Sequence, residues 1–191
     1  MRFVPSNDSP RRAELVEAAY AYVLANGLSD VSLRPIADAI GSSTGVLRFL
    51  FGSRDGLVAA LLERARADEL AMLDQLPDGG DLLVVADAVW DWLAEPAHRP
   101  LLRLWAESYA TSLLNEPGPW AGFAANTVRD WLAVLARAQP PGVRNTAAGR
   151  TQRTAVLALL RGALLDLLAT GDRARTSRAV RTAIVEIMTV S

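Results

Sequence analysis

Apolar residues recur every three to four positions along almost the whole of this chain, whereas strictly alternating patterns are scarce. Residues at the first spacing lie on one face of an α-helix, and alternation is the pattern of a β-strand. Just over half of the 191 residues are hydrophobic (51%), which is enough for such helices to cover one another. We therefore expect an all-α fold.

Residues that start and end helices divide this pattern into segments. Ser9-Pro10 is typical of a helix start, because proline at the first helical position loses no hydrogen bond. Asn26-Gly27 and Gly41 are typical of helix ends. On these signals we expect helices near residues 10–26, 32–40, 43–51, 53–75, 82–94, 99–115, 119–138, 148–170 and 172–190.

The run Pro77-Asp78-Gly79-Gly80 is the strongest break in the helical pattern and the best candidate for a domain boundary. The break predicts three parts. They are three short helices within residues 9–54, a linking helix at 55–76, and a larger helical domain at 81–191.

The composition argues against an enzyme. The chain has no Cys, which excludes disulfides, thiolate metal sites and a cysteine nucleophile. The sole histidine, His98, lies between Pro96 and Pro100 in an expected loop, and glycine-rich phosphate loops and nucleophile-elbow motifs are absent. We therefore expect no catalytic site, no cofactor and no metal.

Membrane insertion and secretion are not expected either. No apolar run approaches the roughly 18 residues that a membrane span requires. The first residues also lack the apolar stretch of a secretion signal, so we expect a cytoplasmic protein. The formal net charge is −1, and the chain therefore has no overall basic field that would attract nucleic acid.

The segment from Ser32 to Arg54, SLRPIADAIGSSTGVLRFLFGSR, contains two short helices joined by a tight glycine turn. These are the parts of a DNA-binding helix-turn-helix, here at residues 32–51, whose second helix lies in the major groove of DNA. At about 100° per residue, the second helix has Leu47, Leu50 and Phe51 on one side, where they can pack inward. An ordinary helical hairpin is the alternative that this geometry leaves open.

The opposite side of the second helix suits DNA chemically. Gly45 lets the two backbones approach closely, and Val46 and Phe49 offer apolar contact to thymine methyl groups. Arginines placed beside them can bind phosphates, which fix the register of a protein on DNA without reading its sequence. We expect the DNA-binding residues to be Arg34, Ser43, Thr44, Gly45, Val46, Arg48, Phe49 and Arg54.

The stretch from about Arg11 to Leu62 resembles the DNA-binding domain of the TetR/AcrR family of bacterial regulators. That family has an Ala-rich first helix ended by glycine, then Ser/Thr-x-x-x-Ile-Ala, Gly-x-Ser-x-Gly-x-Leu-Tyr-x-His-Phe and Ser-Lys-Glu-x-Leu. Arg54 and Asp55 stand in for the Lys-Glu pair and preserve both charges. The matching residues are Ala18, Ala19, Gly27, Ser32, Ile36, Ala37, Gly41, Ser43, Gly45, Leu47, Phe51, Ser53 and Leu57.

Two positions depart from the family pattern. Arg48 stands where the family usually has Tyr, and Leu50 where it usually has His; both family residues commonly touch the DNA backbone. Arg48 replaces a hydroxyl with a longer, charged donor, whereas Leu50 can donate nothing. We expect DNA binding to persist with one fewer hydrogen bond to phosphate.

The resemblance implies that the remaining helices sense a ligand and form a dimer, and the sequence supports the dimer independently. Between Ala155 and Ala169 only Arg161, Gly162 and Asp166 interrupt the apolar residues, so this helix must be covered on more than one side. A second chain related by a two-fold axis can supply that cover, although a monomer core is the alternative. We expect the dimer interface to contain Val156, Leu160, Leu164, Leu167, Val180, Ile184 and Ile187.

Aromatic residues gather beyond the predicted boundary, where all five Trp lie. Each can be a core residue, but together they favour an apolar cavity for a small apolar or aromatic effector. Glu107 can select a cationic or hydroxylated ligand, or face water. We expect the ligand site to draw on Trp90, Trp105, Glu107, Ser108, Tyr109, Phe123 and Trp131.

These features predict a ligand-responsive transcriptional regulator, most simply a repressor, that binds a palindromic double-stranded operator as a homodimer. The alternative is a helical small-molecule-binding or protein-interaction module whose DNA binding has degenerated, as the loss of the usual Tyr and His would allow.

Overall fold

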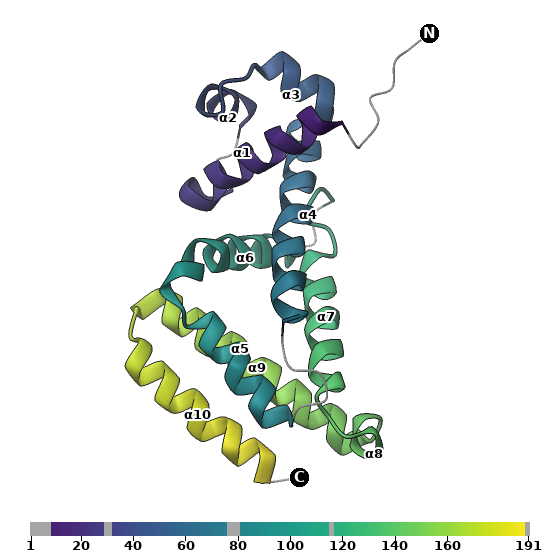
Figure 1. Cartoon of the computed structure of the whole chain (residues 1–191), viewed down its shortest axis with the longest axis vertical. Coiled ribbons are helices and arrows are strands. Elements are labelled where there is room, and N and C mark those ends of the chain that lie inside the picture. Colours follow the sequence, from purple (N-terminus) through teal and green to yellow (C-terminus); the bar gives the residue numbers. More distant parts are fainter. Residues whose placement is uncertain (1–8, 29–31, 76–80, 115–116, 190–191) are drawn as a thin grey trace. The chain divides into compact units, whose positions relative to one another are not determined.

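The computed structural model describes residues 9–28, 32–75, 81–114 and 117–189 (Figure 1). Every regular element in these ranges is a helix, which confirms the predicted all-α fold. None of the described helices combines the length and apolar character that a membrane span needs. In chain order they are α1 (Pro10–Asn26), α2 (Leu33–Ala39), α3 (Thr44–Phe51), α4 (Arg54–Leu73), α5 (Leu82–Leu93), the 3₁₀ helix η1 (Pro96–His98), α6 (Arg99–Ser112), α7 (Phe123–Arg137), α8 (Pro141–Arg144), α9 (Ala147–Thr170) and α10 (Arg173–Thr189).

The largest differences from the predicted helices lie at the start of α7 and at α8. The helix expected from residue 119 begins at Phe123, because Gly122 adopts a left-handed conformation (φ 75°) that interrupts a helix. The short helix α8 was expected to be a break; Pro141 is instead its first helical residue, where proline loses no hydrogen bond.

The helices form two compact units. The first contains the chain up to Leu70 together with Arg103–Ala124, and the second contains Ala71–Leu102 together with the chain from Ala125 onward. Most of α6 thus belongs with the helix-turn-helix, whereas the sequence assigned it to the larger domain. The boundary predicted at Pro77-Asp78-Gly79-Gly80 lies outside the described residues.

The core of the first unit is built from one buried stripe on each of its first four helices. α1 packs against α2, and α2 packs against α3. Burying one such aliphatic side chain contributes about 1.5–3 kcal/mol, so the stripes together hold these short helices in place. The residues with the least exposure are Leu15, Ala19, Val23, Ile36, Ala37, Leu47, Leu57, Val58 and Leu61.

A polar cluster joins α1 to α4 beside this core. The hydroxyl of Tyr20 donates a hydrogen bond to Asp68 (2.9 Å), and Arg64 binds both Asp68 and Glu17. The Arg64 guanidinium also lies over the Tyr20 ring, 5.0 Å from its centroid. Burial raises the pKa of Tyr20 above its ordinary value of 10.0, and the hydrogen bond to Asp68 raises it further.

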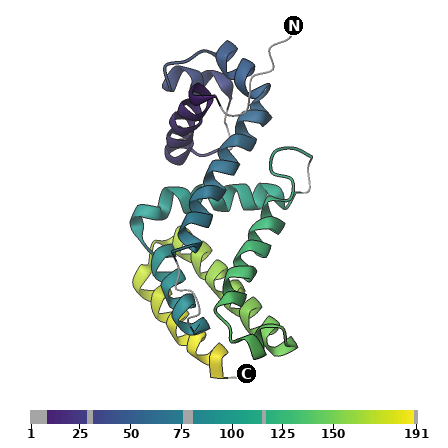
Figure 2. The same ribbon diagram turned by 45° about the vertical axis from the view of Figure 1, so that its right-hand side comes forward.

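The second unit is organised around α9 and α10, which lie side by side in both ribbon views (Figures 1 and 2) and pack together against α5. Trp90 of α5 is fully buried and donates its indole N–H to Ser177 of α10 (3.0 Å). At the surface, Arg181 binds Asp87 (3.0 Å) and Asp91 (2.7 Å), which again ties α10 to α5.

Six of the seven predicted dimer residues need correction, because the chain itself covers them. Val156, Leu160, Leu164, Leu167, Val180 and Ile184 are all buried within the single chain, and Ile187 is half-buried. The apolar stripes of α9 and α10 face each other and α5, so they form the core of the second unit. The exposed large apolar side chains on the described parts of these two helices are Leu165 (52%) and Val185 (51%).

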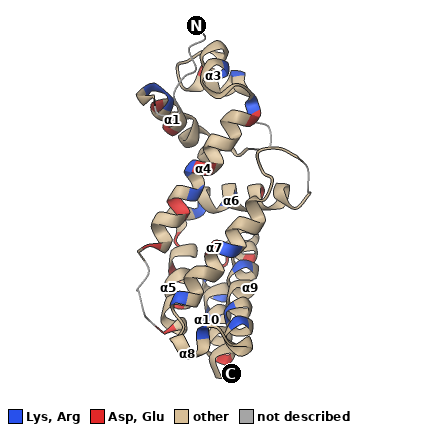
Figure 3. Cartoon of the chain, turned by 90° about the vertical axis from the view of Figure 1, so that its right-hand side faces the viewer, with Lys and Arg blue, Asp and Glu red and all other residues tan. Residues whose placement is uncertain are grey.

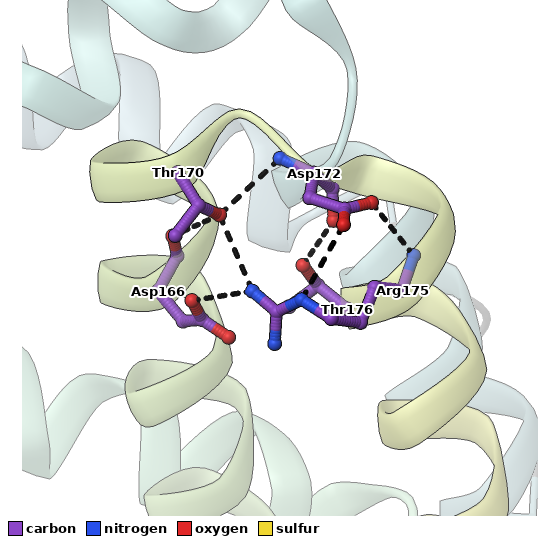
Figure 4. A network of polar contacts seen from close by, with 5 residues as sticks. All are labelled: Asp166, Thr170, Asp172, Arg175 and Thr176. Atoms are coloured by element: carbon purple, nitrogen blue, oxygen red, sulfur yellow. Dashed lines mark hydrogen bonds and ion pairs between the residues drawn. The ribbon is translucent and has the colours of Figure 1, made fainter.

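Polar contacts shape the turn between α9 and α10 (Figure 4). Gly171 ends α9 in the left-handed conformation (φ 72°), and Asp172 accepts a hydrogen bond from the backbone N–H of Arg175 in the first turn of α10 (3.0 Å). The Arg175 guanidinium reaches back to Asp166 of α9 (2.7 Å), and this contact lowers the pKa of the Asp166 carboxyl. Asp166 therefore pairs within the chain.

The Tyr20 cluster makes the stability of the protein sensitive to alkali. Above pH 10 the unfolded chain loses the Tyr20 proton while the folded chain keeps it, so the free energy of unfolding should fall as the pH rises. Urea denaturation at several pH values between about 8 and 11 measures this decline. The Tyr20→Phe variant should be less stable near neutral pH, by about 1 kcal/mol, but should decline less steeply above pH 10. An equally steep decline in the variant would contradict the assignment.

Candidate nucleic-acid interface

Helix α3 has one face in the core and one face in solvent. Ser43 caps its start by accepting a hydrogen bond from the backbone N–H of Val46 (3.2 Å). Leu47 is fully buried, whereas Phe49 keeps 63% of its surface and Val46 keeps 39%. Large apolar side chains are seldom left exposed side by side without a partner, so this outward face is a candidate binding surface.

Two glycines shape this region for different reasons. A Cβ atom at Gly56 would lie 1.9 Å from the backbone oxygen of Phe51, so only glycine allows α4 to begin so close to the end of α3. At Gly45 the nearest atom to an added Cβ would be the Ser43 hydroxyl at 3.7 Å, an ordinary contact distance. The fold does not require glycine at position 45, which leaves room for a role in binding.

Basic residues surround the exposed face, and Figure 3 shows basic positions on α3 and at the start of α4. Arg34 and Arg48 are exposed, and neither forms an ion pair within the described part of the chain. Arg54 is the first residue of α4; it contacts Asp55 (3.4 Å) and lies over the Trp120 ring, 5.7 Å from its centroid. Arg34 and Arg48 therefore keep exposed positive charges in this region, although the whole chain is slightly acidic.

The structure brings most of the predicted DNA-binding residues to this one surface. Gly45, Val46, Arg48 and Phe49 are exposed on α3, and Thr44 is half-buried at its start. The Ser43 hydroxyl oxygen serves as the helix cap, so we assign it first to the fold.

One basic candidate, Arg12, is missing from the sequence prediction. Its guanidinium lies 5.1 Å from the centroid of Phe51, which connects the first turn of α1 to the last turn of α3. The adjacent pair Arg11-Arg12 was the only signal in the sequence, and periodicity alone could not show that α1 begins beside α3.

The predicted ligand residues are divided between the two units. Trp90 and Trp131 belong to the second unit, and both are buried. A cavity of about 80 Å³ in that unit is lined by other residues, among them Leu93, Arg99 and Arg173. In the first unit lie Trp105, Glu107, Ser108, Tyr109 and Phe123.

Two of these polar residues have structural partners. Both carboxylate oxygens of Glu107 accept from the buried backbone N–H of Leu28, at 2.9 and 3.1 Å, just after the end of α1. Ser108 is fully buried and donates to the carbonyl of Leu104 one turn earlier (2.8 Å). Glu107 therefore anchors α6 to α1.

The described residues contain no group of three acidic, His or Cys side chains that could hold a metal ion.

Removing the Glu107 carboxylate should destabilise the first unit. Glu107→Ala leaves the buried N–H of Leu28 without this acceptor, which costs about 1–3 kcal/mol in the free energy of unfolding. Glu107→Gln keeps one acceptor oxygen and should lose clearly less. Denaturant unfolding of the two variants measures the difference, and an unchanged stability of Glu107→Ala would show that the contact is dispensable.

The chain is similar to curated transcriptional regulators in sequence and to solved transcriptional regulators in fold. No protein-family model matches the chain. Over 111 residues the chain is 30% identical to the HTH-type transcriptional regulator BetI of Pseudomonas fluorescens, but the match covers only 54% of the chain and 55% of that protein. BetI of Paraburkholderia xenovorans is 26% identical over 182 residues, which cover 91% of the chain and 89% of BetI. A DNA ligase of Clavibacter sepedonicus is 28% identical over 180 residues, but these are 94% of the chain and only 18% of the ligase.

Solved structures share the fold over nearly the whole chain. A transcriptional regulator from Rhodococcus sp. Rha1 superposes with a TM-score of 0.78 at 22% identity, covering 93% of this chain and 96% of that one. A TetR transcription regulator from Haloarcula marismortui has a TM-score of 0.75 at 17% identity, with 94% and 97% covered. The multidrug binding protein EbrR, complexed with imidazole, has a TM-score of 0.70 at 23% identity, with 97% of both chains covered.

By their descriptions, BetI and the Rhodococcus and Haloarcula proteins are transcriptional regulators, and EbrR is a multidrug binding protein. The resemblance that the helix-turn-helix motif predicts is confirmed, and the chain has the fold of the TetR-family transcriptional regulators.

Proposed function

We propose that this chain is a DNA-binding transcriptional regulator that uses α3 as its recognition helix. The observation that carries the proposal is the exposed face of α3, where Val46 and Phe49 lie beside an Arg48 that forms no ion pair within the described part of the chain. A helix-turn-helix presents such a face to the major groove, where apolar groups meet thymine methyls and arginines meet phosphates or guanines. The BetI proteins, which are similar in sequence, are HTH-type regulators. A regulator of this kind works beside the chromosome, in the cytoplasm.

The active form in this proposal is a homodimer on a palindromic operator. Helix-turn-helix proteins read paired half-sites one helical turn or more apart, and a two-fold axis supplies two recognition helices without a second gene product. The exposed Leu165 of α9 and Val185 of α10 are the apolar side chains that a second copy can cover. The buried apolar residues of α9 and α10 would hold these two helices together behind this surface.

Response to an effector is the remaining part of the proposal, and repression by blocking a promoter is its simplest outcome. EbrR, which shares the fold, has been solved with imidazole and with proflavin. We infer an apolar or aromatic effector for this chain as well. The effector would bind one conformation of the chain more tightly than another. If the two conformations differ in their affinity for DNA, effector binding changes that affinity.

Selection from a random duplex pool, followed by affinity measurements at two salt concentrations, tests the proposal. An enriched inverted repeat, bound more weakly as salt rises, is the expected result. The Arg48→Ala variant should bind all sequences more weakly, with a salt slope smaller by about 1 for each phosphate that the variant no longer neutralises. Absence of enrichment and of low-salt binding would refute the proposal and favour a ligand- or protein-binding module. The observation that supports this alternative is the half-buried Leu50, which stands where the family usually has His, a hydrogen-bond donor.

The recognition helix can be tested at a position that the fold leaves free. Gly45→Ala should fold at least as stably as the natural chain, because the Cβ has room and alanine favours helix by about 1 kcal/mol. The same Cβ would separate α3 from the base edges, and interactions worth about 1–3 kcal/mol would weaken, which is about fivefold or more in affinity. Phe49→Ala should relax base preference as well as lower affinity. Normal DNA binding by both variants would show that another surface meets DNA.

A further inference from the structure

The segment between α6 and α7 contributes an aromatic side chain to the first unit. Residues 117–122 form turns, and the connection is closed where the backbone N–H of Ala124 donates to the Ser112 hydroxyl (3.1 Å). Within this connection Trp120 is half-buried, and its ring meets the guanidinium of Arg54, 5.7 Å from the ring centroid. A segment distant in the sequence therefore contacts the first residue of α4.

The contact between Trp120 and Arg54 is made by the face of the ring and not by a hydrogen bond. The indole N–H of Trp120 is buried and donates to none of the described residues. A buried donor without an acceptor is unfavourable, so hydrogen bonding does not explain why position 120 is a tryptophan. The π face does give a reason, because Trp attracts a guanidinium more strongly than Tyr or Phe does.

An aromatic partner suits an arginine that must bind phosphate. A carboxylate would hold the guanidinium by neutralising it, as the exposed Asp55 does in part at 3.4 Å. A ring face beside the guanidinium restricts the rotamers of Arg54 without itself neutralising the positive charge. A side chain that is ordered before binding loses less conformational entropy when it meets its ligand.

We propose that Trp120 is a positioning residue for DNA binding, which holds Arg54 ready for a backbone phosphate at the start of α4. The inference rests on the proposed function, because Arg54 matters in this way only if the first unit binds DNA. It adds a residue outside the helix-turn-helix to the DNA-binding machinery.

A double-mutant cycle on the whole 191-residue chain tests the proposal. The variants are Arg54→Ala, Trp120→Leu and the two together, and the readout is affinity for the selected DNA at two salt concentrations. Trp120→Leu should weaken binding about two- to fivefold per chain, the range expected for removal of a partly exposed cation–π interaction. Arg54→Ala should lower the salt slope by about 1, and adding Trp120→Leu to it should change nothing further.

Two control variants separate positioning from a general loss of structure. Trp120→Phe keeps a π face and breaks no hydrogen bond within the described residues, so it should retain more affinity than Trp120→Leu. Trp92→Leu removes a half-buried indole from the second unit, where Trp92 stacks on His98, and should leave DNA affinity unchanged. Denaturant midpoints of all variants show whether each remains folded at the temperature of the assay.

The possible results are distinguishable. If Trp120→Leu weakens binding equally with and without Arg54, or if Trp120→Phe is as weak as Trp120→Leu, the positioning role is wrong while the proposed function stands. If the natural chain binds no DNA at low salt, the proposed function fails, and the positioning role fails with it. Coupling between the two positions in DNA affinity, with rescue by Phe, supports both.

Discussion

Burial of Leu47 beneath α3 is the contact on which the proposed interface depends. Once that side chain is fully enclosed, the 3.6-residue period of the helix leaves Gly45, Val46, Arg48 and Phe49 toward solvent. The approach of α4 to Phe51, which only a glycine at position 56 permits, then limits how α3 can tilt. The eight-residue α3 would be unstable alone, and packing of its inner face against the rest of the unit holds it in a helical conformation.

Polar contacts between distant segments define the extent of the first unit. Glu107 accepts from the backbone N–H of Leu28, Tyr20 and Arg64 join α1 to α4, and Trp120 lies over Arg54. Each contact satisfies a buried group or orders a charged one, and each joins segments that are far apart in the sequence. Through them most of α6 and the α6–α7 connection become part of the unit that carries the helix-turn-helix.

In the second unit, the same apolar stripes could have served a core or an interface. Between Ala155 and Ala169 the sequence predicts cover on more than one side, and the structure supplies most of it from α10 and α5. Val156, Leu160 and Leu164 are buried by these contacts within the chain. In the proposed dimer, a second copy would therefore cover the exposed surface around Leu165 and Val185. Hydrophobic periodicity shows that a face is buried but not what buries it, since intramolecular and intermolecular cover remove the same apolar area from water.

Local patterns in the sequence determined most of the helices, the glycine turn and the outward face of α3, because each depends on residues within one or two turns of one another. Only the tertiary structure decided that Glu107 is an anchor for α1, that Trp90 is a core residue bonded to Ser177, and that Trp120 meets Arg54. The sequence interpretation placed Glu107 and Trp90 in a ligand site, since an acid or a tryptophan within an apolar helix has the same local pattern in either role. The partner of such a side chain comes from a distant segment, and the folding of the chain, not the spacing of its residues, brings the two together.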